Sequence, residues 1–127
     1  MEKYNDVKEI LKIADSRERW KKVCELDDYF ARYEVLMSIH DNELLKEIAL
    51  SKTDGMLAID AAERINDQRI LAEIALKRNV DYRVRLKAIS YLENDEALSE
   101  LALRNDDDSK IRLRAIEQLD DGQEALW

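Results

Sequence analysis

The sequence predicts an all-α protein built from about four stacked helix pairs, and two observations support this prediction. The chain of 127 residues contains no proline and only two glycines, so it offers few of the residues that favour the tight turns of β-hairpins. A pattern of aspartate, arginine, alanine and leucine also recurs every 26 or 27 residues. A fixed spacing of this size is typical of repeat architectures, in which each short unit is stabilised by its neighbours.

The repeat is clearest in two segments, which read DYRVRLKAISYL (residues 81–92) and DSKIRLRAIEQL (residues 108–119). Two earlier segments, 28–39 and 54–65, keep the same columns in a degraded form. Each of the four begins with an aspartate that can accept the unpaired backbone N–H groups of a first helical turn. These capping positions are Asp28, Asp54, Asp81 and Asp108.

A second capping residue follows each of these aspartates after thirteen residues, at Asp41, Asp67, Asn94 and Asp121. The apolar residues after each cap are spaced by three or four, which predicts an amphipathic helix. Each repeat is therefore expected to form two short helices, such as 82–92 and 95–104. Helices of this length are marginal when isolated in water, so stacking of the repeats must stabilise them.

Arginine stands four residues after three of the capping aspartates. This spacing predicts i,i+4 ion pairs on the helix surface, each worth a few tenths of a kcal/mol when exposed. The predicted pairs are Asp28/Arg32, Asp81/Arg85 and Asp108/Arg112. Ala58 interrupts this column in the second repeat.

The chain reads as a single domain, 1–127, with atypical ends. Residues 1–27 are expected to form a modified N-terminal cap with helices at 5–14 and 16–26, and Trp20 falls in an apolar column that predicts a core position. The repeats are expected at 28–53, 54–80, 81–107 and 108–127. The last is truncated early in its second helix, where Trp127 is expected to cover the final apolar surface.

The columns resemble those of HEAT-like repeats, with the variant leucine-rich repeats as a second choice. The pattern Asp-x-x-(Val/Ile)-Arg-x-x-Ala is visible in residues 81–88 and 108–115. The resemblance implies a right-handed α-α superhelix, armadillo-like in architecture, that serves as a non-catalytic scaffold for protein binding. It also implies a concave inner face built from the Asp…Val-Arg helices, which are expected near 16–26, 28–38, 55–65, 82–92 and 109–119.

The exposed columns of these inner helices supply the candidate partner-binding residues. Their expected members are Tyr29, Phe30, Met56, Tyr82, Arg83, Lys87, Lys110 and Arg114. The groove would then be aromatic and apolar at one end and basic at the other. The alternative for the cations is a solvated helix face balanced by acidic loops. The alternative for the aromatic residues is that they seal the core of the irregular first repeat, and Tyr33 in particular occupies an apolar column.

No catalytic, metal-binding or cofactor-binding motif is expected. His40 is the only histidine and Cys24 the only cysteine, so neither a closed zinc site nor a disulfide is indicated. The sequence also has no glycine-rich phosphate loop, no HExxH and no Ser-His-Asp pattern. A minority of HEAT-like arrays resemble bilin lyases or DNA-repair glycosylases, so a lyase-like or other enzyme subunit stays open as an alternative.

Charge and hydropathy limit the classes of partner that the protein is expected to bind. The net charge of -8 argues against general affinity for nucleic acid or anionic lipid, and no run of residues is apolar enough to cross a membrane. We therefore expect a cytoplasmic protein, a monomer or weak homodimer, that binds a protein or peptide with acidic groups. A nucleic-acid-binding accessory role through the basic residues of the last two repeats is the alternative.

Overall fold

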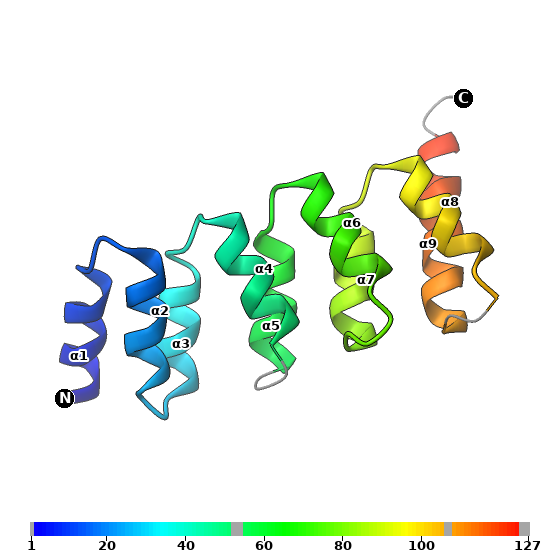
Figure 1. The fold of residues 1–127 in the computed structure, drawn as a ribbon. Helices are drawn as coiled ribbons and strands as arrows, with labels where there is room; N and C mark the ends of the chain where they lie inside the picture. The colour runs from blue at the N-terminus through cyan, green and yellow to red at the C-terminus, as the bar shows by residue number, and fades with distance from the viewer. Residues whose placement is uncertain (1, 52–54, 106–107, 125–127) are drawn as a thin grey trace.

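The computed structural model describes residues 2–51, 55–105 and 108–124, and these residues form nine α-helices without a strand (Figure 1). The helices are α1 (Glu2–Leu11), α2 (Ser16–Cys24), α3 (Tyr29–Leu36), α4 (Asn42–Leu50), α5 (Gly55–Arg64), α6 (Gln68–Leu76), α7 (Tyr82–Ser90), α8 (Asp95–Leu103) and α9 (Ser109–Glu124). The prediction of an all-α protein is confirmed. None of the described helices is long and apolar enough to span a membrane.

Side-chain caps begin most of these helices, as the sequence predicts. In each case a carboxylate or amide oxygen accepts a hydrogen bond from a backbone N–H of the first turn. The capping residues are Asp15, Asp28, Asp41, Asp67, Asp81 and Asn94. Asp108 likewise accepts from the backbone N–H of Lys110 at 2.8 Å. The predicted cap at Asp54 lies outside the described residues.

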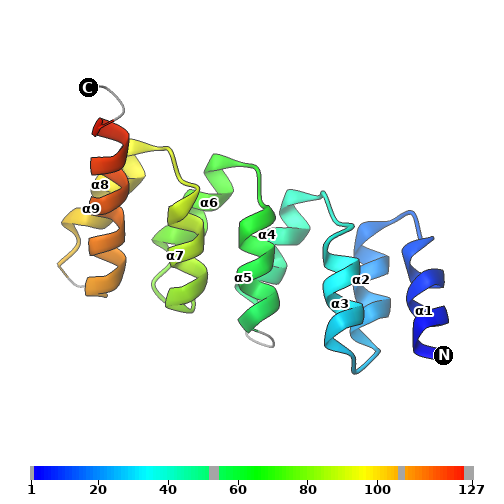
Figure 2. The same cartoon turned by 180° about the vertical axis from the view of Figure 1, so that it is seen from behind.

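The helices form two layers, shown from opposite sides in Figures 1 and 2. Helices α1, α3, α5, α7 and α9 lie side by side in one layer, here called the odd layer. Helices α2, α4, α6 and α8 form the even layer, and each also packs against the following odd helix. Because every helix packs on its neighbours along the chain, the arrangement is compatible with a helical repeat.

The position of α2 differs from the prediction for residues 16–26. These residues were expected on the same face as the Asp…Val-Arg helices, but α2 lies in the even layer beside α4. Residues 25–28 are too few to carry the chain across α3, so α2 and α3 become antiparallel partners in opposite layers. Helix α1 consequently occupies the position in the odd layer that residues 16–26 were expected to take.

The last repeat also differs from the prediction. A helix break was expected at Asp121, but α9 continues through this residue to Glu124. In the other repeats, the residue five positions after Ile39, Ile65 or Leu92 lies in the second helix, is apolar and is buried. These residues are Leu44, Ile70 and Ala97. Glu124 occupies this position in the last repeat, so the apolar residue that the other second helices bury there is missing. Trp127 lies outside the described residues.

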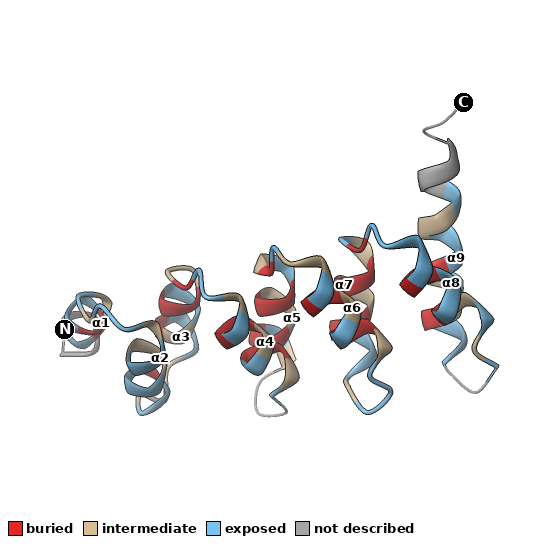
Figure 3. Cartoon of the chain, turned by 45° about the horizontal axis from the view of Figure 1, so that its top comes forward, coloured by how far each residue is buried: buried red, intermediate tan, exposed pale blue. Residues whose placement is uncertain are grey.

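Burial is continuous along the array, as the red segments between the layers show in Figure 3. One large apolar cluster runs from Leu36 on α3 to Ala115 on α9. A smaller cluster joins α1, α2 and α3 around Val7, Val23 and Val35. Trp20 is half-buried and packs against both clusters. It therefore connects the N-terminal helices to the rest of the core, in agreement with its apolar column.

Arginine side chains connect these elements in a way that the sequence did not predict. Arg32, expected to pair with Asp28, instead donates from Nη2 to the carbonyl of Cys24 at the end of α2, at 3.1 Å. Arg85 is only 2% exposed, and its Nε donates to the carbonyl of Ala75 near the end of α6, at 2.9 Å. The last four carbonyls of a helix have no partner within the helix, so both arginines satisfy such groups, and the bond from Arg85 satisfies one that burial would otherwise penalise.

Three further arginines donate to backbone carbonyls outside their own helix. Arg104 Nη1 bonds the carbonyl of Leu76 at 2.9 Å, so α6 is held at its end from both α7 and α8. Arg64 Nη2 bonds the carbonyl of Ile39 at 2.9 Å. Arg19 Nη1 bonds the carbonyl of Ile13 at 2.6 Å. The positive charge also favours a helix C-terminus through the helix dipole.

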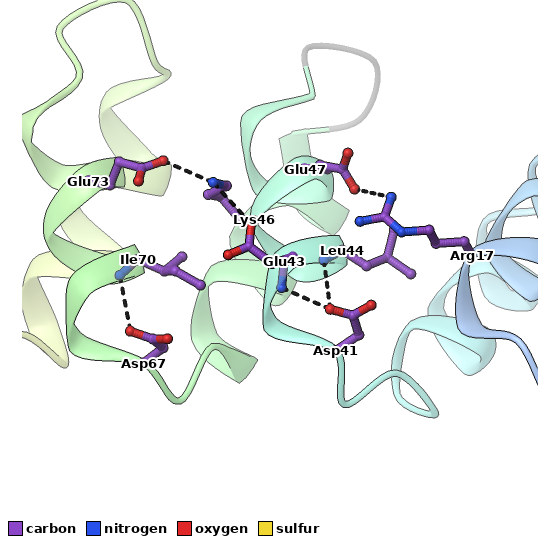
Figure 4. Close-up of polar contacts among 9 residues, drawn as sticks. All are labelled: Arg17, Asp41, Glu43, Leu44, Lys46, Glu47, Asp67, Ile70 and Glu73. Carbon is purple, nitrogen blue, oxygen red and sulfur yellow. Dashed lines mark hydrogen bonds and ion pairs between the residues drawn. The ribbon is translucent and has the colours of Figure 1, made fainter.

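Ion pairs link the helices of the even layer at its surface (Figure 4). Arg17 on α2 pairs with Glu47 on α4. Lys46 on α4 pairs with Glu73 on α6 at 3.1 Å and with Glu43 at 3.2 Å. These pairs are partly exposed, so each adds little to the stability of the fold. Their charges are neutralised within the even layer.

The buried arginine bond gives a stability prediction. We expect Arg85→Ala to lower the free energy of unfolding by about 2–3 kcal/mol, because a charged hydrogen bond is lost and a buried carbonyl is left without this partner. Urea unfolding followed by circular dichroism measures the change. The matched control is Arg69→Ala, at an exposed arginine of α6, with an expected effect within about 0.5 kcal/mol. Equal losses in the two variants would contradict the role of Arg85.

Candidate functional site

The second residues of four odd-layer helices form the candidate binding face. Phe30, Met56, Arg83 and Lys110 follow the first residues of α3, α5, α7 and α9, and all four are exposed. These helices lie side by side in one layer (Figure 2), and the four residues take the same position on their helices, so they follow one another across the array. We call this set the row. It is apolar over α3 and α5 and basic over α7 and α9.

The apolar end of the row is more exposed than a core-sealing role allows. Phe30 is 79% exposed, and its ring meets that of Tyr29 edge to face at 5.6 Å between centroids. Met56 is 56% exposed. Tyr33 was expected in the core but is 41% exposed, unlike Ile59 and Leu86 of the same column, which pack against the core. A cluster of large apolar side chains in water is typical of an interaction surface.

At the basic end, Arg83 is bound to its own helix cap. Its Nη2 and Nε donate to the carboxylate of Asp81 at 2.9 and 3.2 Å. The side-chain hydrogen bonds from Arg83, with its backbone N–H and its positive charge, hold the pKa of the Asp81 carboxyl below the usual range. The same contact raises the pKa of the Arg83 guanidinium. Arg83 therefore offers a partner less free positive charge than the sequence suggests.

Two other predicted cations connect α9 to α7. The ammonium group of Lys110 lies 4.6 Å from the centroid of the Tyr82 ring, a cation–π contact that leaves its outer side open to solvent. Arg114 donates to the hydroxyl of Ser90 at 3.1 Å and pairs with Glu117 at 3.4 Å. The structure thus brings Tyr82 and Lys110 together, and gives Arg114 partners of its own.

Lys87 stands apart from these pairs. It is half-buried on α7, and within the described part of the chain it shares no carboxylate partner with Arg83 or Arg114. The four predicted cations therefore share a face but are not equivalent. Lys87 and Lys110 are the two that form no ion pair with a carboxylate among the described residues.

A cavity of 290 Å³ beside Arg83 was missed by the sequence reasoning. Its lining includes Leu50, Gly55, Ala58, Val80 and Arg83. A Cβ at Gly55 would lie 2.9 Å from Nη2 of Arg83, so the absence of a side chain there lets the guanidinium approach. Ala58 stands where other repeats have arginine. This interruption of the arginine column is the sequence feature that could have indicated the cavity.

His40 and Cys24 do not join this face. His40 is exposed in the turn between α3 and α4, and Cys24 ends α2 in the even layer. Burial raises the pKa of the Cys24 thiol, while the charge of Arg32 acts in the opposite direction. Since the thiolate is the nucleophilic form, the raised pKa lowers the reactivity of this thiol at neutral pH.

Comparison of the chain with protein-family models, with curated proteins and with solved structures gives no match.

The contact between Arg83 and Asp81 gives a pH prediction. A carboxyl with a depressed pKa in the folded state stabilises the fold above its ordinary pKa, and this contribution is lost as the pH falls through the folded value. We expect Arg83→Ala to raise the pKa of Asp81 toward the ordinary 3.8, as measured by NMR titration of the side-chain carboxyl carbon. Arg104→Ala removes a different arginine and should leave the titration of Asp81 unchanged. An unaltered titration in Arg83→Ala would refute the proposed cause.

Proposed function

We propose that the protein is a non-enzymatic, protein-binding HEAT-like scaffold, a right-handed superhelix that acts in the cytoplasm as a single domain. The resemblance of the 81–88 and 108–115 segments to HEAT-like repeats supports this class, and so does the stacking of short capped helices. The observation that carries the proposal is the row Phe30, Met56, Arg83 and Lys110, which places apolar and basic side chains at equivalent positions on adjacent helices.

The row suits an extended peptide segment. Neighbouring helices pack with axes 8–10 Å apart, so three intervals cover about 25–30 Å. An extended chain advances about 3.3 Å per residue, and about eight or nine residues therefore match this length. Recognition of an extended segment through side chains set along a groove is a common mode of peptide binding.

The two ends of the row select opposite chemistry in the partner. Phe30 and Met56 favour large apolar side chains, because burial of apolar area drives association. Lys87 and Lys110 favour acidic side chains, and Tyr82 fixes the position of Lys110 through the cation–π contact. We therefore propose a partner segment that is apolar where it meets α3 and α5 and acidic where it meets α7 and α9.

This proposal is tested by selection from a random library of displayed ten-residue peptides. We expect the selected peptides to combine large apolar residues at one end with aspartate or glutamate at the other. Phe30→Asp and the double variant Lys87→Glu/Lys110→Glu should each weaken binding of the best peptide about tenfold or more, as measured by calorimetry. Both changes alter exposed or half-buried side chains, so thermal stability should stay close to that of the wild type.

Arg69→Glu is the matched control, because it reverses an exposed charge on α6 in the even layer. It should leave peptide affinity unchanged. Selected peptides without acidic residues, or equal affinity for all variants, would refute the assignment of this face. A mobility shift with a single-stranded oligonucleotide that decreases steeply with salt would favour nucleic acid over peptide as the partner.

A further inference from the structure

Two arginines donate to the last carbonyls of α6. Arg85 on α7 donates from Nε to the carbonyl of Ala75, and Arg104 after α8 donates from Nη1 to the carbonyl of Leu76, both at 2.9 Å. These carbonyls have no acceptor role within the helix, and the C-terminus of a helix carries partial negative charge. The end of α6 is thus a place where the fold itself binds guanidinium groups.

The equivalent end of α4 has neither of these donors. The two helices read NELLKEIAL and QRILAEIAL, so Ala49 and Leu50 correspond to the two acceptor residues of α6. Ala58 and Lys77 stand at the positions of the two arginines, and Lys77 is exposed. Among the described residues, no side chain donates to the carbonyls of Ala49 or Leu50.

The 290 Å³ cavity lies at this end of α4. It is lined by Ala49 and Leu50 on one side and by Ala58 of α5 on the other. In the next repeat, the side chain of Arg85 joins the same two elements. The cavity therefore occupies the place that an arginine side chain takes one repeat later. Gly55 also lines it and has no side chain to fill it.

The remaining walls of the cavity suit a cation on an alkyl stem. Val80 and Val84 line it together with Ala58, and such apolar surface packs well against methylene groups. Asp81 and Arg83 are the charged residues of the described lining, and they pair with each other at 2.9 Å. Because these two charges offset each other, the negative end of the α4 dipole decides which sign of charge the cavity favours.

We propose that this cavity binds an alkylguanidinium group, whose N–H groups donate to the carbonyls of Ala49 and Leu50. A planar guanidinium can donate to two neighbouring carbonyls in a fixed geometry, which an ammonium group does less well. Ligand pockets usually measure about 300–1,000 Å³, so a cavity at the lower limit suits one side-chain-sized group. The arginine side chain of a partner and a free small molecule both carry this group. The inference does not depend on the proposed peptide row.

Titration of the ¹⁵N-labelled full chain with butylguanidinium, followed by the amide chemical shifts, tests the proposal. We expect saturable shifts at Gly55 and Val80 with a millimolar Kd. Butylurea has a similar shape without the charge, and it should bind about tenfold more weakly because its hydrogen bonds are not charge-assisted. No saturable shift, or equal affinity for butylurea, would overturn the proposal.

A blocked pentapeptide with one arginine between glycines distinguishes the two sources of the group. Tighter binding of this peptide than of butylguanidinium supports the site and identifies a protein partner as the source. Tighter binding of butylguanidinium also supports the site and identifies a small molecule.

Two variants of one residue test the location of the site. Ala58→Arg introduces the arginine of the other repeats and should abolish the binding of butylguanidinium while keeping the helical circular dichroism spectrum. Ala58→Leu fills the same space without a donor, so it should also abolish binding and serves if Ala58→Arg does not fold. Ser99→Arg adds the same charge at an exposed position of α8 and should leave the affinity unchanged. Binding that persists in a folded Ala58 variant, or that is lost in Ser99→Arg, would overturn the assignment to this cavity.

Discussion

The donation of arginine N–H groups to backbone carbonyls of neighbouring elements is the interaction on which the array depends. Helices of eight to ten residues leave nearly half of their carbonyls without an intrahelical partner, and the chain has no proline and few glycines to end them in compact turns. Arg32 and Arg85 supply the missing donors from the following helix. Each bond therefore satisfies a helix end and fixes one helix relative to the next in the same contact.

This use of arginine limits what the basic residues can do elsewhere. Although the protein has 21 lysines and arginines, many of those described here are engaged within the fold. Arg83 and Arg114, which look like free cations in the sequence, have carboxylate partners on their own helices. On the candidate binding face, the charge left for a partner is concentrated at Lys87 and Lys110, in the same layer as the apolar end of the row. A small number of cations beside exposed aromatic residues suits selective recognition of a short segment better than general attraction to polyanions.

The features that depend on neighbouring residues in the chain were predictable. The caps at Asp28, Asp41 and Asn94 follow from local hydrogen bonding, and the apolar columns identify most of the core. The partners of Arg32 could not be read from spacing, because Asp28 and the Cys24 carbonyl are both within reach and only the packing of α2 on α3 decides between them. The sequence predicted which residues share the candidate binding face, but it did not predict their contacts. The partners of Arg83 and Arg114 depend on the rotamers that these side chains adopt.

Departures from the repeat are more informative about function than the repeat itself. A residue that fits its column is explained by capping, packing or the carbonyl bonds, whereas a residue that breaks its column creates something the other repeats lack. Gly55 and Ala58 break theirs and line a cavity that reaches Arg83 in the row. Glu124 breaks its column where a second helix would begin, and α9 continues to this residue as one helix that exposes Leu113 and Ile116. Both departures lie next to exposed side chains that the fold does not use, which is where binding can be gained without loss of stability.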